Sequence, residues 1–276
     1  MATNVFLNYT SSGIRASIND NAQGNGNIQW ITLTDPDEAY DIVADYLIIC
    51  ANCFYDPNNF LSDVWKIANY RATYNGFDVA ILNADNLISD DLGFFYEGSL
   101  TGDESHKREQ RIRTCIRRIY EGTNAQHTYD GKLGYVLLIG DSDPPSNSGM
   151  PTSYDNTWQP GQGEPFYPSD YYFSCVTKQG SSYDLTGDLF IGRFCVDNNL
   201  EYGLTELQNV VNKTIYYESE ATFGGWRNET GVLMYHGFTN YGALYFDFMD
   251  GLVPSYFTVD KISGSQPDVQ EQFFIK

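Results

Sequence analysis

Short runs of consecutive apolar residues alternate along the chain with segments whose apolar residues recur every three or four positions. The clearest run, Tyr-Val-Leu-Leu-Ile at 135–139, lies between Gly134 and Gly140. An uninterrupted run of this length predicts a strand that is buried on both faces, as in the centre of a parallel sheet. Similar runs predict further buried strands at 45–51, 77–82 and 188–196.

Helical spacing connects these strands at three places, 59–75, 107–120 and 199–217. Gly76 follows the first of these segments and is expected to end it, because glycine readily adopts the left-handed conformation that closes many helices. Weaker patterns predict strands at 171–176, 231–236 and 257–262 and an amphipathic segment at 241–252.

The final segment begins as a helix, since Ser265-Gln-Pro-Asp offers an N-cap residue, an early proline and an acidic first turn. The sequence ends at Lys276, about three turns later at about 3.6 residues per turn. We therefore expect a fold truncated at its C-terminus. Strands 232–235 and 258–262 would then present an open edge, and we expect self-association there because open edges recruit other chains.

This order of elements predicts an α/β fold, with a mainly parallel sheet flanked by helices in three layers. Residues 1–43 are polar and rich in glycine and asparagine, and are expected to form an N-terminal extension or an edge strand. Residues 44–165 are expected to form a first α/β subdomain and residues 166–276 an incomplete second one. The long loop at 144–169 has no periodicity, which is typical of a functional loop or a boundary.

Composition narrows the range of partners. The formal net charge of −20 argues against nucleic acid and against an anionic membrane surface. No apolar run reaches about 18 residues, so no membrane span is predicted. The first residues lack the basic and apolar regions of a signal peptide, and richness in aromatic residues, asparagine and glycine favours an extracellular or cell-surface protein.

The five cysteines have no spacing typical of a zinc site. They lie on apolar segments, so buried free thiols are the simplest interpretation. Cys50-Ala-Asn-Cys53 has the spacing of a redox motif, but it lies at the end of a predicted strand and no proline follows at once.

Two acidic residues, Asp141 and Asp143, follow the run at 135–139. Ligands of open parallel sheets gather at the carboxyl ends of the strands, so these carboxylates are candidate site residues. The alternative is an ordinary turn, for which Asp-Ser-Asp-Pro-Pro is also typical. The five arginines of the helix at 107–120 could bind an anion or could simply solvate one helix face.

Five motifs occur in order over most of the chain: 67–77 (a helix ending in Gly and an aromatic residue), 135–141, 168–172, 187–194, and 206–218 with Trp226 after it. In these motifs the chain resembles the gingipain-type cysteine peptidases, secreted proteases with a caspase-like fold. The resemblance implies protein or peptide substrates and a Cys/His dyad, in which an imidazole takes the thiol proton and backbone amides stabilise the oxyanion.

The resemblance also implies where the dyad should lie. The family's histidine stands in a His-Gly pair at the end of a strand, and its cysteine ends the next strand. Only His236 precedes a glycine here, no cysteine follows it, and by family order its strand comes one unit too early. The dyad is thus expected beyond Lys276, with no catalytic residue in this chain; Cys175 and Cys195 are expected to be core thiols, and His236 to lie near the rim of the active site.

The family also binds Ca²⁺ through carboxylates and carbonyls, which makes Asp141, Asp143 and Asp170 the candidate ligands of a structural Ca²⁺. Two functions remain open: part of a cysteine endopeptidase, inactive by itself, or a non-catalytic α/β binding or scaffold module with the same fold. A phosphotransfer receiver is disfavoured, because Cys50-Ala-Asn-Cys-Phe lacks the acidic pair expected after the first strand.

Overall fold

A computed structural model of the 276-residue chain describes 4–10, 13–19, 26–88, 104–122, 133–142, 150–154, 168–179, 182–183, 186–220, 229–234 and 258–263. The chain forms two compact units, residues 1–217 and 218–276. The expected division after residue 165 falls inside the first unit and stays a prediction. In the second unit, two strands, β12 (Glu229–Met234) and β13 (Thr258–Ser263), pair in parallel.

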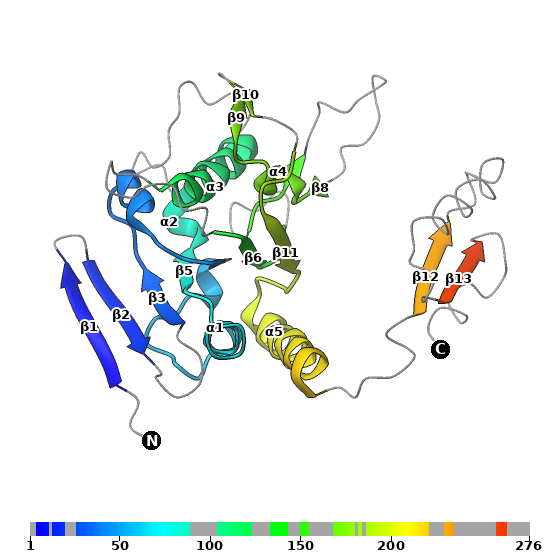
Figure 1. Cartoon of the computed structure of the whole chain (residues 1–276), viewed down its shortest axis with the longest axis horizontal. Helices are drawn as coiled ribbons and strands as arrows, with labels where there is room; N and C mark the ends of the chain where they lie inside the picture. The colour runs from blue at the N-terminus through cyan, green and yellow to red at the C-terminus, as the bar shows by residue number, and fades with distance from the viewer. Residues whose placement is uncertain are drawn as a thin grey trace. The chain divides into compact units, whose positions relative to one another are not determined.

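A seven-stranded sheet organises the first unit, with the strand order β1-β2-β3-β5-β4-β6-β11 (Figure 1). The strands are β1 (Asn4–Thr10), β2 (Gly13–Asn19), β3 (Asn27–Ile31), β4 (Tyr46–Cys50), β5 (Val79–Asn83), β6 (Tyr135–Ile139) and β11 (Phe190–Phe194). The pairs from β3 to β11 are all parallel, whereas the β1–β2 hairpin adds to β3 in antiparallel fashion. The predicted parallel α/β sheet is therefore confirmed.

The run at 135–139 forms β6 as predicted, and it is buried on both faces: Leu137 and Leu138, which lie in opposite cores, are 4% and 0% exposed. Its position needs a correction, because β4 is the centre of the five parallel strands and β6 lies between β4 and β11. The fifth parallel strand is β3, which pairs with β5 on the side away from β4. Its residues Ile28 and Trp30 are buried because they pack into the same core as α1. β3 is not an edge strand, since it pairs with β2 on one side and with β5 on the other.

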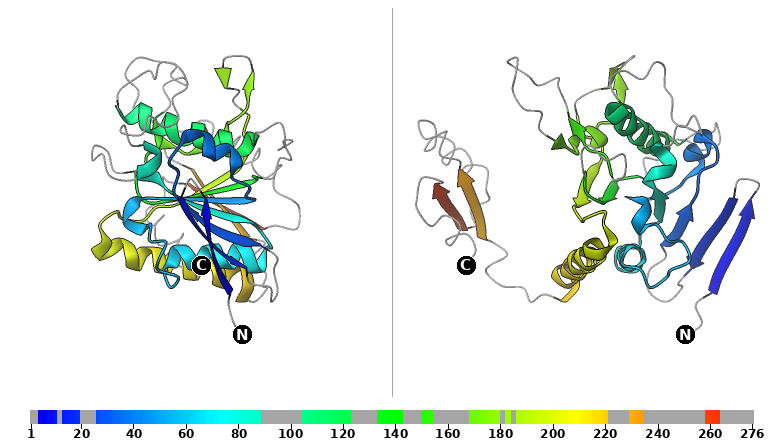
Figure 2. Two further views of the ribbon diagram at one scale, coloured as in Figure 1. Left: turned by 90° about the vertical axis from the view of Figure 1, so that its left-hand side faces the viewer. Right: turned by 180° about the vertical axis from the view of Figure 1, so that it is seen from behind.

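Helices cover both faces of this sheet, giving three layers (Figure 2). On one face lie α1 (Asp63–Tyr74) and α5 (Leu200–Ile215), which also pack against each other; on the other face lie α2 (Ala84–Ile88) and α3 (Glu104–Glu121). Successive side chains of β4 point to opposite faces of the sheet and so enter the two hydrophobic cores in turn: Leu47 and Ile49 face α3, whereas Ile48 faces α1. The pattern Tyr-Leu-Ile-Ile-Cys is apolar throughout because both faces are covered.

A capping residue starts α1 and a glycine ends it. The Ser62 side chain accepts a hydrogen bond from the backbone N–H of Trp65, which caps the first turn. At the other end Gly76 has a φ of 74°, so it ends the helix in the left-handed region as predicted.

One element differs in type from its prediction. The segment at 171–176 was expected to be a strand, but Tyr171–Ser174 forms the short helix α4. Aromatic and β-branched residues favour strands only where a neighbouring strand can pair with them. Here the Ser169 hydroxyl accepts from the N–H of Tyr171 at 3.2 Å and Asp170 carbonyl accepts from that of Phe173 at 3.0 Å, which begins a helical turn instead.

The remaining elements are short. They are η1 (Pro36–Asp41), η2 (Asn52–Phe54), β7 (Ser153–Tyr154), β8 (Pro168–Ser169), β9 (Lys178–Gln179), β10 (Ser182–Tyr183) and η3 (Tyr216–Glu220). The segments expected to be helical at 241–252 and after Ser265 lie outside the described residues.

At the amino ends of the strands, four aromatic rings lie together in a row of near-parallel planes, here called the aromatic row: Phe77, Tyr46, Tyr135 and Phe190. The ring centroids of Tyr135 and Phe190 are 5.5 Å apart with an interplanar angle of 19°. The register explains the row, because Tyr46 and Phe190 are the strand partners of Tyr135 on either side. The opposite edge of the sheet carries the polar groups.

Candidate functional site at the carboxyl edge of the sheet

The carboxyl ends of the parallel strands meet at one edge, which is where open α/β sheets hold their ligands. The chain leaves this edge at Ala51 after β4, at Gly140 after β6 and at Cys195 after β11. Two backbone hydrogen bonds extend the ladders past the strands: Ala51 N–H to Ile139 carbonyl, 2.9 Å, and Gly140 N–H to Phe194 carbonyl, 3.1 Å. The edge is therefore held in register up to the first polar residues.

Gly140 turns the chain sharply out of β6. Its φ of 132° is a conformation that residues with a side chain rarely adopt. A Cβ at this position would also lie 3.0–3.3 Å from Asn198 Oδ1, Ala51 Cβ and Met150 Cβ. The chain itself thus occupies the space directly next to Gly140.

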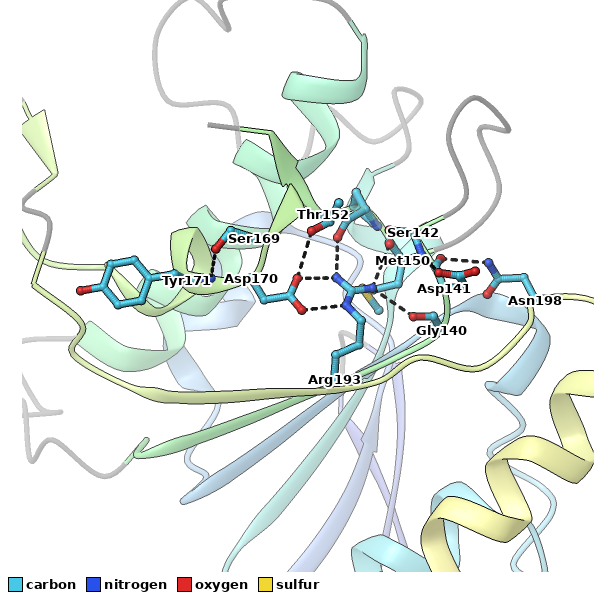
Figure 3. Close-up of polar contacts among 11 residues, drawn as sticks. Gly140, Asp141, Ser142, Met150, Thr152, Ser169, Asp170, Tyr171, Arg193 and Asn198 are labelled. Carbon is cyan, nitrogen blue, oxygen red and sulfur yellow. Dashed lines mark hydrogen bonds and ion pairs between the residues drawn. The ribbon is translucent and has the colours of Figure 1, made fainter. Parts of the chain in front are cut away.

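The next residue, Asp141, has its main chain fixed and its side chain exposed (Figure 3). Its carbonyl accepts hydrogen bonds from Met150 N–H at 3.2 Å and from Asn198 Nδ2 at 3.0 Å. Its carboxylate oxygen Oδ1 accepts from the N–H of Ser142 at 2.7 Å. Among the described residues, the Asp141 carboxylate at the end of β6 therefore has one contact, with the neighbouring backbone N–H of Ser142.

Arg193 of β11 is the most densely bonded side chain of this edge (Figure 3). Its guanidinium donates to both carboxylate oxygens of Asp170, from Nε at 2.9 Å and from Nη2 at 2.7 Å. It also donates to three main-chain carbonyls, those of Gly140 at 3.0 Å, Met150 at 3.0 Å and Pro151 at 2.9 Å. The Arg193 side chain is 6% exposed and that of Asp170 24%, so this is a largely buried ion pair.

Sequence reasoning did not identify Arg193. The signal was present, because a charged residue inside the apolar strand Phe-Ile-Gly-Arg-Phe must find a partner when it is buried. What the sequence could not show is the identity of the partner, since Asp170 lies 23 positions away and the three carbonyls belong to other segments.

The candidate Ca²⁺ ligands are separated by these contacts. Asp141 is exposed at the end of β6, Asp170 is engaged by Arg193 and by the Thr152 hydroxyl at 3.3 Å, and Asp143 lies outside the described residues. Within the described part, no three histidine, cysteine or acidic side chains lie together as a metal-binding group. The described residues do not form a Ca²⁺ site by themselves, and Ca²⁺ binding stays a prediction.

The cysteines follow their prediction in three cases of five. Cys50, Cys115 and Cys175 are buried free thiols, Cys53 is half-buried, and Cys195 is exposed. The expectation that Cys195 is a core thiol is wrong, because Cys195 is exposed just after the end of β11, although the next residue, Val196, is buried. Burial raises the pKa of Cys50, of Cys53 and of Cys115 above the ordinary thiol value.

The Cys50-Ala-Asn-Cys53 segment lies at the ends of β4 and β5 among polar side chains. Asn83 Nδ2 donates to Asn52 Oδ1 at 2.7 Å, and Asn83 Oδ1 accepts from the N–H of Asp85 at 3.0 Å. Burial raises the pKa of Asp85, against the opposing charge of Arg108. A redox or nucleophilic cysteine needs a lowered pKa, so the raised pKa values of Cys50 and Cys53 argue against that interpretation of this segment.

The histidines give no dyad in the described part of the chain. His236 and His127 lie outside the described residues, and His106 lies in the first turns of α3, where side chains are not described. The placement of His236 near the rim of an active site therefore stays a prediction.

The arginines of α3 have a third role that was not anticipated. Arg111 donates to the carbonyl of Ile88 in α2, Arg113 lies over the Tyr172 ring of α4 with its Cζ 3.6 Å from the ring centroid, and Arg118 donates to Asp37 of η1 at 3.1 Å. Arg111 and Arg117 are buried. These side chains connect α3 to its neighbours instead of forming a solvated face or an open anion site.

Comparison with known proteins identifies the family to which this chain belongs. Among the described residues, no helix combines the length and the apolar character needed to cross a membrane. Neither the search of curated proteins nor the search of solved structures gave a match. The model of peptidase family C25 matches residues 39–273, which include four of the five parallel strands and all the residues of the carboxyl edge described above. The chain therefore belongs to peptidase family C25, the gingipain family of cysteine peptidases.

Proposed function

We propose that this chain is part of the catalytic domain of a gingipain-like cysteine endopeptidase that acts on proteins or peptides. The family match over residues 39–273 is the observation that carries the proposal, and the parallel α/β sheet of the first unit agrees with it. In such an enzyme a histidine takes the thiol proton, the thiolate attacks the scissile carbonyl, and backbone amides stabilise the oxyanion.

The dyad itself is proposed to lie outside the described residues, beyond Lys276 by the order of the family's motifs. Burial raises the pKa of Cys50, Cys53 and Cys115, whereas a nucleophilic cysteine needs a lowered pKa, which argues against these three thiols as the nucleophile.

Peptide hydrolysis by two forms of the protein tests this proposal. The chain ending at Lys276 and the full natural coding sequence are each incubated with a fluorogenic peptide library, with and without a thiol-alkylating inhibitor. We expect inhibitor-sensitive cleavage by the longer form and none by the 276-residue chain. Cleavage by the shorter chain that His236→Ala abolishes would show that the dyad has been misplaced.

The alternative function is a non-catalytic α/β binding or scaffold module with the same fold. The same assay separates the two functions. A longer form that contains a His-Gly strand and a later strand ending in cysteine, yet cleaves nothing in the library, would favour the module.

We further propose an extracellular or cell-surface location and a structural Ca²⁺ held by Asp141 together with Asp143. The exposed carboxylate of Asp141 supports the second proposal, because only one of its oxygens has a described contact, with the Ser142 N–H. Carboxylate oxygens on a loop are ligands that suit Ca²⁺.

A further inference from the structure

The oxygens around Arg193 form an enclosed set, here called the guanidinium cage: Asp170 Oδ1 and Oδ2 and the carbonyls of Gly140, Met150 and Pro151. An arginine side chain has five N–H donors in a planar fork. All five are used here, each on a different oxygen at 2.7–3.0 Å. The match between the number of donors and the number of oxygens is complete.

The cage has the chemistry of a cation site. A carboxylate that offers both oxygens, together with main-chain carbonyls, is the kind of oxygen set that Ca²⁺ also uses. The geometry differs, because Ca²⁺ needs its oxygens at about 2.3–2.6 Å from one central point. Here the oxygens lie around the rim of a planar group, at hydrogen-bond distance from its nitrogens and farther from its central carbon.

We propose that this cage is a guanidinium-selective cation site whose resident ligand is Arg193, and that Asp170 serves as the counter-ion of Arg193 and not as a Ca²⁺ ligand. The resident cation fastens three segments to β11: the turn after β6 through Gly140, the segment that covers that turn through Met150 and Pro151, and the start of α4 through Asp170. Met150 is fully buried, so the cage also holds an apolar side chain over the ends of β4 and β6.

Chemical rescue tests the selectivity of the cage. Arg193→Ala removes the guanidinium but leaves all five oxygens, and we expect the melting temperature to fall. Guanidinium or methylguanidinium at millimolar concentration, far below denaturing levels, should then raise it again, whereas equal concentrations of Ca²⁺, K⁺ or ammonium should not. Arg118→Ala is the matched control, because Arg118 contacts the exposed carboxylate of Asp37 and guanidinium should not rescue its loss.

A second variant decides the question if Arg193→Ala does not fold. Arg193→Lys keeps the charge but has three donors on one nitrogen and cannot reach five oxygens around a plane. We expect it to melt clearly below the wild type, and the backbone amide of Met150 to exchange hydrogen faster. A melting temperature equal to that of the wild type would overturn the proposal, as would rescue of Arg193→Ala by Ca²⁺ as effective as that by guanidinium.

The counter-ion role of Asp170 has a separate readout. Calcium titration by calorimetry is carried out on the wild type, on Asp170→Asn and on Asp141→Asn. Whatever affinity the wild type has, Asp170→Asn should leave it unchanged at a temperature where the variant is folded. A loss of Ca²⁺ affinity specific to Asp170→Asn would show that Asp170 binds the metal and would overturn its assignment as a counter-ion.

Discussion

Replacing Gly203 by alanine tests how closely the first turn of α5 approaches the loop after β11. A Cβ at Gly203 would lie 1.8 Å from the carbonyl oxygen of Asp197 and 3.0 Å from the Phe54 ring. The Asp197 main chain cannot simply withdraw, because its N–H donates to Glu206 Oε2 at 2.8 Å and so ties it to α5 itself. The first turn of α5 and the Asp197 main chain must therefore move apart.

The expected cost follows from two opposing effects. Overpacking costs about 1–3 kcal/mol, and a collision with backbone belongs at the upper end of that range. The better helix propensity of alanine returns about 1 kcal/mol. The net loss is about 2 kcal/mol, which for a unit of this size lowers the melting temperature by about 4–8 °C.

Thermal melts followed by circular dichroism measure this loss, and urea titration gives the free energy of unfolding. Gly192→Ala is the matched control, since nothing lies within 4 Å of a Cβ at Gly192 in β11. It should leave stability unchanged within about 0.5 kcal/mol. If Gly203→Ala melted as high as the wild type, the close contact between α5 and Asp197 would be refuted.

Four further predictions concern the core, the thiols, the metal and the assembly. Leu138→Ala should cost about 2–5 kcal/mol in urea titrations because Leu138 is fully buried in β6. Iodoacetamide at neutral pH should label the exposed Cys195 before the buried Cys50 or Cys115. The free energy of unfolding should fall as the pH rises above the ordinary thiol pKa, because the thiols of Cys50 and Cys115 then lose their protons in the unfolded chain but, with their raised pKa, keep them in the folded protein. Chelation of Ca²⁺ should lower the melting temperature of the wild type but not of Asp141→Asn. Light scattering should show association through the edge of β12 and β13; a monodisperse monomer would contradict it.

The strands of the first unit were predictable because burial on both faces leaves a simple mark. Each residue of β4 and β5 is buried, and all of them except Asn83 are apolar or aromatic, so each run stands out from its surroundings. The helices α1 and α5 were predictable for a related reason, since one side of each faces the sheet and repeats every three or four residues.

The segment around α4 and the guanidinium cage were not predictable in this way. Tyr171 to Ser174 has the residues of a strand, but its first turn depends on the Ser169 hydroxyl and the Asp170 carbonyl. The Asp170 side chain is held in turn by Arg193, 23 positions away. Three of the groups that bind Arg193 are main-chain carbonyls, and every residue type carries the same main-chain carbonyl. The local sequence pattern therefore does not show which carbonyls lie next to Arg193.

The aromatic row at the amino ends of the strands gives the protein an intrinsic optical marker of correct strand alignment. Its rings come from β4, β6, β11 and the turn before β5, and they stack only when Tyr46, Tyr135 and Phe190 are register partners. A slip of one residue would send Tyr135 to the opposite face of the sheet. The near-ultraviolet circular dichroism that these coupled rings produce should therefore appear late in refolding, after the helical signal, because the strands that carry them are far apart along the chain.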